Sequence, residues 1–126
     1  MKIKIIACLI LIGLLLSCKK EGTSTQEQDE KALQELASII MEMTAVDCAD
    51  ASQWAYTAFG DKPCGGPAEY IAYPTSINTT HFLNLVKEHQ QAAREYNQRW
   101  GLISDCMVVG SPKAVICENG KAVLEY

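Results

Sequence analysis

The cysteines limit the possible folds of this chain more than any other feature. Of six cysteines, Cys8 and Cys18 lie near the start, and the body holds four more: Cys48, Cys64, Cys106 and Cys117. A domain of about 100 residues has a modest core, so covalent crosslinks can supply a large part of its stability. An even set predicts two disulfides, provided that the chain is exported to an oxidising compartment.

The N-terminal residues have the layout of a secretory signal. Lys2 and Lys4 precede a run of twelve residues, Ile5–Leu16, that is apolar apart from one glycine, and the small residue Ser17 follows. This order of basic, apolar and small residues is typical of a signal peptide. A helix that spans a bilayer needs roughly 20 apolar residues, so the run is too short for a permanent span. We therefore expect export.

The stretch Leu15-Leu16-Ser17-Cys18 resembles the lipobox of bacterial lipoproteins. The resemblance implies that Cys18 is the lipidation site: it receives a diacylglyceryl group, the peptide before it is removed, and the new amino terminus is acylated, as with palmitate. Several acyl chains make a stable anchor, where a single chain binds marginally. Lys19 stands where the inner-membrane retention pattern has aspartate. The resemblance thus implies a membrane-anchored envelope lipoprotein of the outer membrane, on either its periplasmic or its surface face.

The predicted organisation has three parts. Residues 1–17 are the lipoprotein signal peptide, residues 18–28 are the acylated cysteine with a flexible tether, and residues 29–126 are one disulfide-stapled domain. The tether is predicted because residues 19–28 are all polar or glycine. Without Lys2 and Lys4, the chain has 9 basic and 15 acidic residues, which gives a net charge of −6. This acidic body argues against nucleic acid as a partner.

We expect an α+β fold in which two amphipathic helices pack on a C-terminal three-stranded antiparallel meander. Apolar residues recur at helical spacing over residues 29–44 and again over residues 80–100. A residue among Asn78–Thr80 can cap the second helix, and Gly101 follows it. The segment 47–78 between the helices is rich in glycine and proline, which predicts irregular structure with a short strand at Glu69–Tyr73.

The meander also predicts a disulfide pairing. Asn119-Gly120 is a strong hairpin signal that sets Glu118 opposite Lys121. A second hairpin, with Gly110–Lys113 as its loop, would join a strand at Asp105–Val109 to one at Ala114–Glu118 and place Cys106 opposite Cys117. The predicted pairs are Cys106–Cys117 and, by exclusion, Cys48–Cys64. We expect the helices to cover the apolar face of this sheet: Cys106, Val108, Val115, Cys117, Ala122 and Leu124.

Few residues suggest catalysis or metal binding. The chain has no Cys-x-x-Cys pair for zinc and no Gly-x-Ser-x-Gly, His-Glu-x-x-His or Ser-x-x-Lys motif. His89 lies on the apolar stripe of the second helix, where we expect a packed histidine with one hydrogen bond. We therefore predict no catalytic residue, no metal and no cofactor. Cys64–Pro67 and Ser104–Cys106 also make the body similar to small, uncharacterised four-cysteine bacterial exported proteins, a resemblance that implies no activity.

The functional prediction is a non-enzymatic binding or inhibitory module that acts on an envelope or extracellular protein. A disulfide-closed hairpin tip would offer a pre-ordered contact surface. Its residues are Val109, Gly110, Ser111, Pro112 and Lys113. A sheet face with Met107, Val109, Ile116 and Val123 is the second candidate surface. A small envelope hydrolase and a structural envelope lipoprotein remain alternatives.

Overall fold

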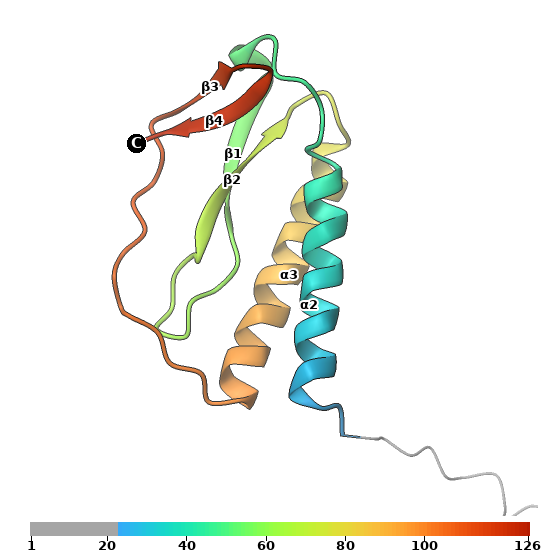
Figure 1. Ribbon diagram of the computed structural model, residues 1–126, viewed down its shortest axis with the longest axis vertical. Helices are drawn as coiled ribbons and strands as arrows, with labels where there is room; N and C mark the ends of the chain where they lie inside the picture. The colour runs from blue at the N-terminus through green and yellow to red at the C-terminus, as the bar shows by residue number, and fades with distance from the viewer. Residues whose placement is uncertain (1–22) are drawn as a thin grey trace, which may run out of the picture.

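The computed structural model describes residues 23–126, so the predicted signal peptide, Cys18 and the start of the tether lie outside the described part of the chain. The described residues form two long helices, two antiparallel hairpins and a 3-10 helix, η1 (Ala51–Gln53). Figure 1 shows α2 and α3 side by side, with the β1–β2 hairpin next to them and the β3–β4 hairpin at the end remote from the tail. The α+β class with two helices and two disulfides is confirmed.

Helix α2 (Gln26–Glu42) begins inside the predicted tether. Thr25 caps it: the Thr25 hydroxyl accepts from the N–H of Gln28, and the Gln28 side chain accepts from the N–H of Thr25. This reciprocal capping box satisfies two backbone donors, which explains why helix formation extends into residues without apolar side chains. The expected start at Asp29 was therefore three residues late, and residues 26–28 are not tether.

Helix α3 (Thr79–Arg99) agrees closely with its prediction. Asn78 is the N-cap, with its side chain accepting from the N–H of His81, and Gly101 follows the helix at φ +60°. Its buried stripe meets α2 and the β1–β2 hairpin in the hydrophobic core. The core residues come from all four elements: Ile40, Phe59, Ile71, Phe82 and Val86.

The segment between the helices is more regular than predicted. Strand β1 (Trp54–Phe59) pairs with β2 (Glu69–Pro74), so that Tyr56 lies opposite Ala72. The predicted short strand is confirmed, but its partner was missed. Aromatic residues and threonine suit a pleated, half-buried strand, whereas the glycines and all but one proline lie in the connection between β1 and β2, and Pro74 ends β2.

The C-terminal hairpin has the predicted register but no third strand. Strand β3 (Ala114–Glu118) pairs with β4 (Lys121–Glu125), with Glu118 opposite Lys121 and positive φ at Asn119 and Gly120. Residues 105–109 pair with no strand, which corrects the predicted meander. The Lys113 N–H bonds to the Glu125 carbonyl, so Lys113 extends the pairing of β3 with β4 and does not form part of the predicted four-residue loop.

The disulfide pairing was also predicted wrongly. Cys48 is joined to Cys117 and Cys64 to Cys106, with Cα–Cα distances of 5.3 and 5.5 Å. Because no hairpin forms between residues 105 and 118, Cys106 is free to reach the β1–β2 turn. The helices, moreover, pack on β1–β2, and it is this hairpin that contacts β3 and β4. The expected packing of both helices on the C-terminal sheet is therefore corrected.

Candidate binding surfaces

Residues 102–113, which we call the strap, connect α3 to β3 along one side of the molecule (Figure 1). Three of its large apolar side chains are unusually exposed: Ile103 at 95 %, Met107 at 72 % and Val108 at 93 %. Single exposed apolar residues are ordinary, but several in one short segment mark a candidate interaction surface.

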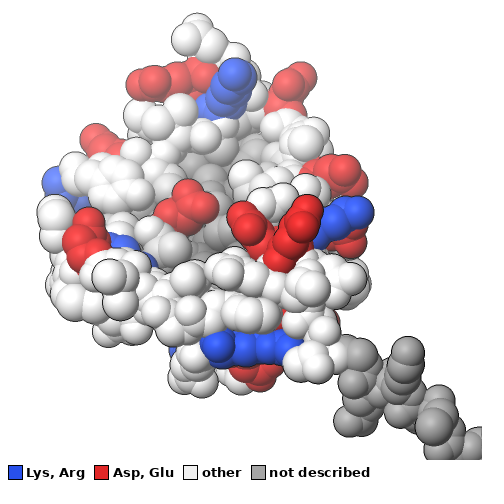
Figure 2. Space-filling view, turned by 60° about the horizontal axis from the view of Figure 1, so that its bottom comes forward, with Lys and Arg blue, Asp and Glu red and all other residues white. Residues whose placement is uncertain are grey.

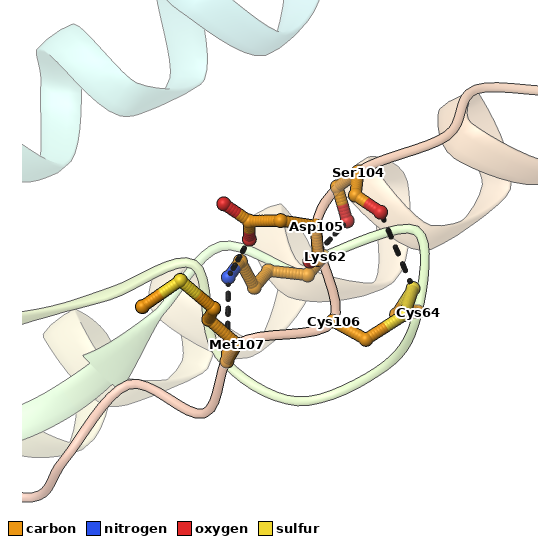
Figure 3. Close-up of a disulfide and its surroundings, with 6 residues drawn as sticks. All are labelled: Lys62, Cys64, Ser104, Asp105, Cys106 and Met107. Carbon is orange, nitrogen blue, oxygen red and sulfur yellow. Dashed lines mark hydrogen bonds and ion pairs between the residues drawn. A yellow bond between two sulfur atoms is a disulfide. The ribbon is translucent and has the colours of Figure 1, made fainter.

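A disulfide and a lysine hold the middle of the strap (Figure 3). The Lys62 ammonium donates to Asp105 Oδ1 at 2.9 Å and to the Met107 carbonyl at 2.8 Å, on either side of Cys106. The hydrogen bond from Lys62, helped by its charge, lowers the pKa of the Asp105 carboxyl. Cys64 Sγ also lies 3.6 Å from the Ser104 carbonyl oxygen, a close approach without a donated proton, because a disulfide sulfur carries none. The strap is thus ordered by contacts that the sequence alone did not suggest.

The predicted binding tip is not a tip in the structure. Its five residues form the second half of the strap, and neither disulfide closes them into a loop with Cys117. Pro112 is buried and Val109 half-buried, whereas Gly110, Ser111 and Lys113 are exposed. The second candidate face is divided as well, since Met107 lies in the exposed strap and Ile116 and Val123 are half-buried opposite each other. The structure therefore does not bring either predicted surface together.

A groove of about 460 Å³ lies at the end remote from the tail, between the end of α2, strand β2 and strand β4. We call it the edge groove. Four consecutive residues of β2, from Glu69 to Ala72, line it. Side chains alternate between the two faces of a strand, so an unbroken run of lining residues means that the strand edge faces the groove. The other lining residues are Met41, Thr44, Ala45, Val46, Asp47, Trp54, Gly120, Lys121, Ala122 and Leu124.

The edge of β2 in this groove is open. Apart from its pairing with β1, no hydrogen bond within residues 23–126 involves residues 69–74. The outer side of β1 differs, because the Gln90 side chain on α3 donates to the Ala58 carbonyl at 3.2 Å. An open strand edge is a template for pairing with another chain.

The groove between α2 and α3 has a volume of about 400 Å³ and charged groups at one end. There the Asp29 carboxylate accepts from the Trp100 indole and pairs with Arg99, both at 3.1 Å. A hydrogen bond from Ser24, together with these two partners, lowers the pKa of Asp29. Because the charges satisfy one another, their evident role is to hold the helix ends together.

His89 is packed in the core, as predicted. It is 8 % exposed, and its ring stacks on Phe59 with centroids 4.3 Å apart. Burial lowers the pKa of the imidazole, so the ring is neutral near pH 7. The expected hydrogen bond is missing at Nδ1, a buried atom with no partner in the described structure. His89 is not among the residues that line the edge groove, and it lies outside the strap.

The surface shows mixed charge and no basic patch in the view of the tail end (Figure 2). Asp and Glu side chains are spread over this face around a hollow, some of them next to Lys or Arg. Over residues 23–126 no three metal-binding side chains gather into a cluster, and Cys48, Cys64, Cys106 and Cys117 are all in disulfides. Helices long and apolar enough to cross a membrane are likewise not found in that range.

Comparisons with protein-family models, curated proteins and solved structures found no match. The candidate surfaces therefore rest on the geometry of this chain. Sequence reasoning missed the edge groove because it missed strand β1. The run of aromatic residues and a threonine in Trp54–Phe59 was the sequence signal that could have revealed it.

Proposed function

We propose that this protein is a lipid-anchored lipoprotein of the bacterial cell envelope, located at the outer membrane, whose body is a non-enzymatic binding module. The anchoring rests on the N-terminal sequence, with its basic start, apolar run and Leu-Leu-Ser-Cys stretch ending at Cys18. The body that such an anchor would hold begins with the cap residue Thr25, only a few residues later. The partner is an envelope or extracellular protein.

The open edge of β2 is the observation that carries the binding proposal. Residues Glu69–Ala72 line a groove of about 460 Å³. Small-molecule and peptide sites commonly have volumes of roughly 300–1,000 Å³. The site that best fits a strand edge at the base of a groove is one for an extended peptide, which adds to the sheet as a further strand. Main-chain hydrogen bonds then supply affinity, and side-chain pockets supply specificity.

The side chains around this edge indicate what the peptide carries. Trp54, Met41 and Val46 offer apolar contacts, and the exposed fractions of the last two are 46 % and 49 %. The charged side chains of the lining are two acidic ones, Asp47 and Glu69, and one basic one, Lys121. An extended segment with alternating apolar side chains is therefore the proposed ligand, presented by a larger protein.

Anchoring is tested with Cys18→Ser in cells fed radiolabelled palmitate. Wild-type protein should carry the label and appear in the membrane fraction at the processed size. The variant lacks the thiol that accepts the diacylglyceryl group, so it should remain an unlabelled precursor. Equal labelling of both proteins would contradict the proposed lipidation.

Binding is tested with a photoreactive benzoylphenylalanine in place of Tyr70, which lines the edge groove. Irradiated cells should give a discrete crosslinked product. Ala45→Arg should abolish it, since Ala45 is exposed and lines the groove, so the new side chain blocks the site without disturbing the core. Ala49→Arg is the matched control at an exposed alanine outside the groove and should leave the product unchanged. Loss in both variants, or in neither, would refute the edge groove as the binding site.

A further inference from the structure

We infer that the strap lies against the lipid bilayer, with Ile103, Met107 and Val108 in contact with its interface. This inference rests on the proposed lipid anchor at Cys18 and adds an orientation to it. It follows from three features: where the N-terminal tail joins the body, how little chain separates that point from Cys18, and which side chains are exposed beside it.

The tail is fixed to the C-terminal end of α3. Arg99 Nη1 donates to Ser24 Oγ at 2.8 Å, and Nη2 donates to the Ser24 carbonyl at 3.3 Å. One residue further on, the Trp100 indole holds Asp29 of α2 at 3.1 Å. The chain therefore leaves the body next to the residues at which α3 ends and the strap begins, as Figure 1 shows.

The covalent distance from this point to the proposed lipid is short. Ser24 is the sixth residue after Cys18. A fully extended chain spans at most about 3.6 Å per residue, so the Ser24 backbone can be no more than roughly 22 Å from an acylated Cys18. This is an upper limit whatever the conformation of those residues. The end of the body that carries Arg99 is consequently the end held close to the membrane surface.

The strap presents apolar side chains at this end. The Leu102 N–H bonds to the Asn97 carbonyl at 3.0 Å, so the first strap residue is fixed to α3 and Ile103 directly follows it. Further along, Lys62 and the Cys64–Cys106 disulfide hold the backbone at Met107. Ile103 and Val108 are both more than nine-tenths exposed. Ordered residues lose little conformational freedom on contact, which favours their burial in an interface.

The charged groups near the strap indicate which kind of lipid surface it contacts. Three ion pairs neutralise charged groups around the strap and the adjoining helix end: Asp29 with Arg99, Asp61 with Arg94, and Asp105 with Lys62. Figure 2 shows acidic groups spread over this end and no patch of basic groups. Binding to anionic lipid depends on clusters of Lys and Arg. The strap therefore suits a zwitterionic surface, which it meets through apolar contact.

The test uses the full-length acylated protein in phosphatidylcholine vesicles whose acyl chains carry a photoactivatable diazirine. After irradiation and digestion, peptide fragmentation locates the lipid adducts. Adducts should concentrate at Ile103, Met107 and Val108, at least tenfold above those at Ile39 and Met41. The last two serve as an internal control, because they are exposed apolar residues near the end of α2 remote from the tail.

The double variant Ile103→Asp, Val108→Asp checks the role of the apolar side chains. It should lower the adduct yield at Met107 several-fold while palmitate labelling of Cys18 stays at the wild-type level, since all substituted side chains are exposed. Adducts spread evenly, confined to the N-terminal peptide, or unchanged in the double variant would overturn the bilayer contact and leave the anchor intact. Absence of palmitate on the wild-type protein would instead refute the anchor itself.

Discussion

At the scale of single residues, His89 links stability to pH. Its ring is buried against Phe59, and burial lowers its pKa below the ordinary 6.5. The unfolded chain then binds the proton more tightly than the folded chain, so stability rises with pH in this range. We expect the free energy of unfolding to fall as the pH drops below about 6.5, by up to about 1.4 kcal/mol per pH unit.

His89→Leu should remove this slope, because leucine does not titrate and suits the same apolar site. Near pH 7 the variant should be as stable as the wild type or more so, since it removes a buried nitrogen without a partner. Urea unfolding between pH 4.5 and 7.5 measures both effects. His81→Leu, at an exposed position, is the matched control, and its profile should keep the slope. A slope that persists in His89→Leu would assign the acid sensitivity to another group.

At the scale of elements, the two disulfides join different parts of the fold and differ in their burial. Cys64–Cys106 joins the strap to the β1–β2 turn, and both of its cysteines are exposed. Cys48–Cys117 joins the end of the first helical region to β3, and Cys48 is 4 % exposed, with its N–H bonded to the Gly120 carbonyl at 2.9 Å. In the chain-entropy model each disulfide contributes about 4 kcal/mol to the stability of the fold. Because the two contributions are similar, the burial of the cysteines decides which disulfide costs more stability when it is removed.

We expect Cys48→Ser, Cys117→Ser to be less stable than Cys64→Ser, Cys106→Ser by about 1–3 kcal/mol, the cost of burying an unpaired hydroxyl. Chemical denaturation of the two double variants measures this difference. A phosphine reductant added to the wild type should open Cys64–Cys106 first, as differential alkylation would show. Prior reduction of Cys48–Cys117 would contradict the burial found here. Peptide mapping without reduction should recover the same two pairs.

At the scale of the whole molecule, the strap begins at the tail end and runs along one side to β3, whereas the edge groove lies toward the end remote from the tail (Figure 1). Helix α2 has 17 residues, which corresponds to about 25 Å of length. It runs from the tail to the edge groove, so the start of the strap at Ile103 is separated from the part of the groove at the end of α2 by about that distance (Figure 1), whereas Val108 lines a pocket with Pro67, two residues before Glu69 of the groove. A body held at the membrane by the start of its strap would keep the part of the groove at the end of α2 away from the lipid. This arrangement leaves the groove accessible to a partner.

The sequence by itself determined the elements that depend on local patterns. The apolar stripe through Phe82 and Val86 predicted α3, with Asn78 among its predicted caps and Gly101 after its end. Asn119-Gly120 predicted the register of the C-terminal hairpin, because few residue pairs accept positive φ at both positions. The even number of cysteines predicted two disulfides. Each of these predictions needs only residues that are near one another in the chain, or a count.

Only the tertiary structure decided which distant segments meet. Whether Cys106 joins Cys117 or Cys64 depends on whether residues 110–113 turn back, and the bond from the Lys113 N–H to Glu125 lies outside any local pattern. The pairing of β1 with β2 and the open edge that results are likewise long-range. The exposure of Val108 was not predicted either, since the sequence suggested that it lies on the covered face of a sheet. Local propensity acts along the chain, whereas these features depend on packing between segments that are far apart in sequence.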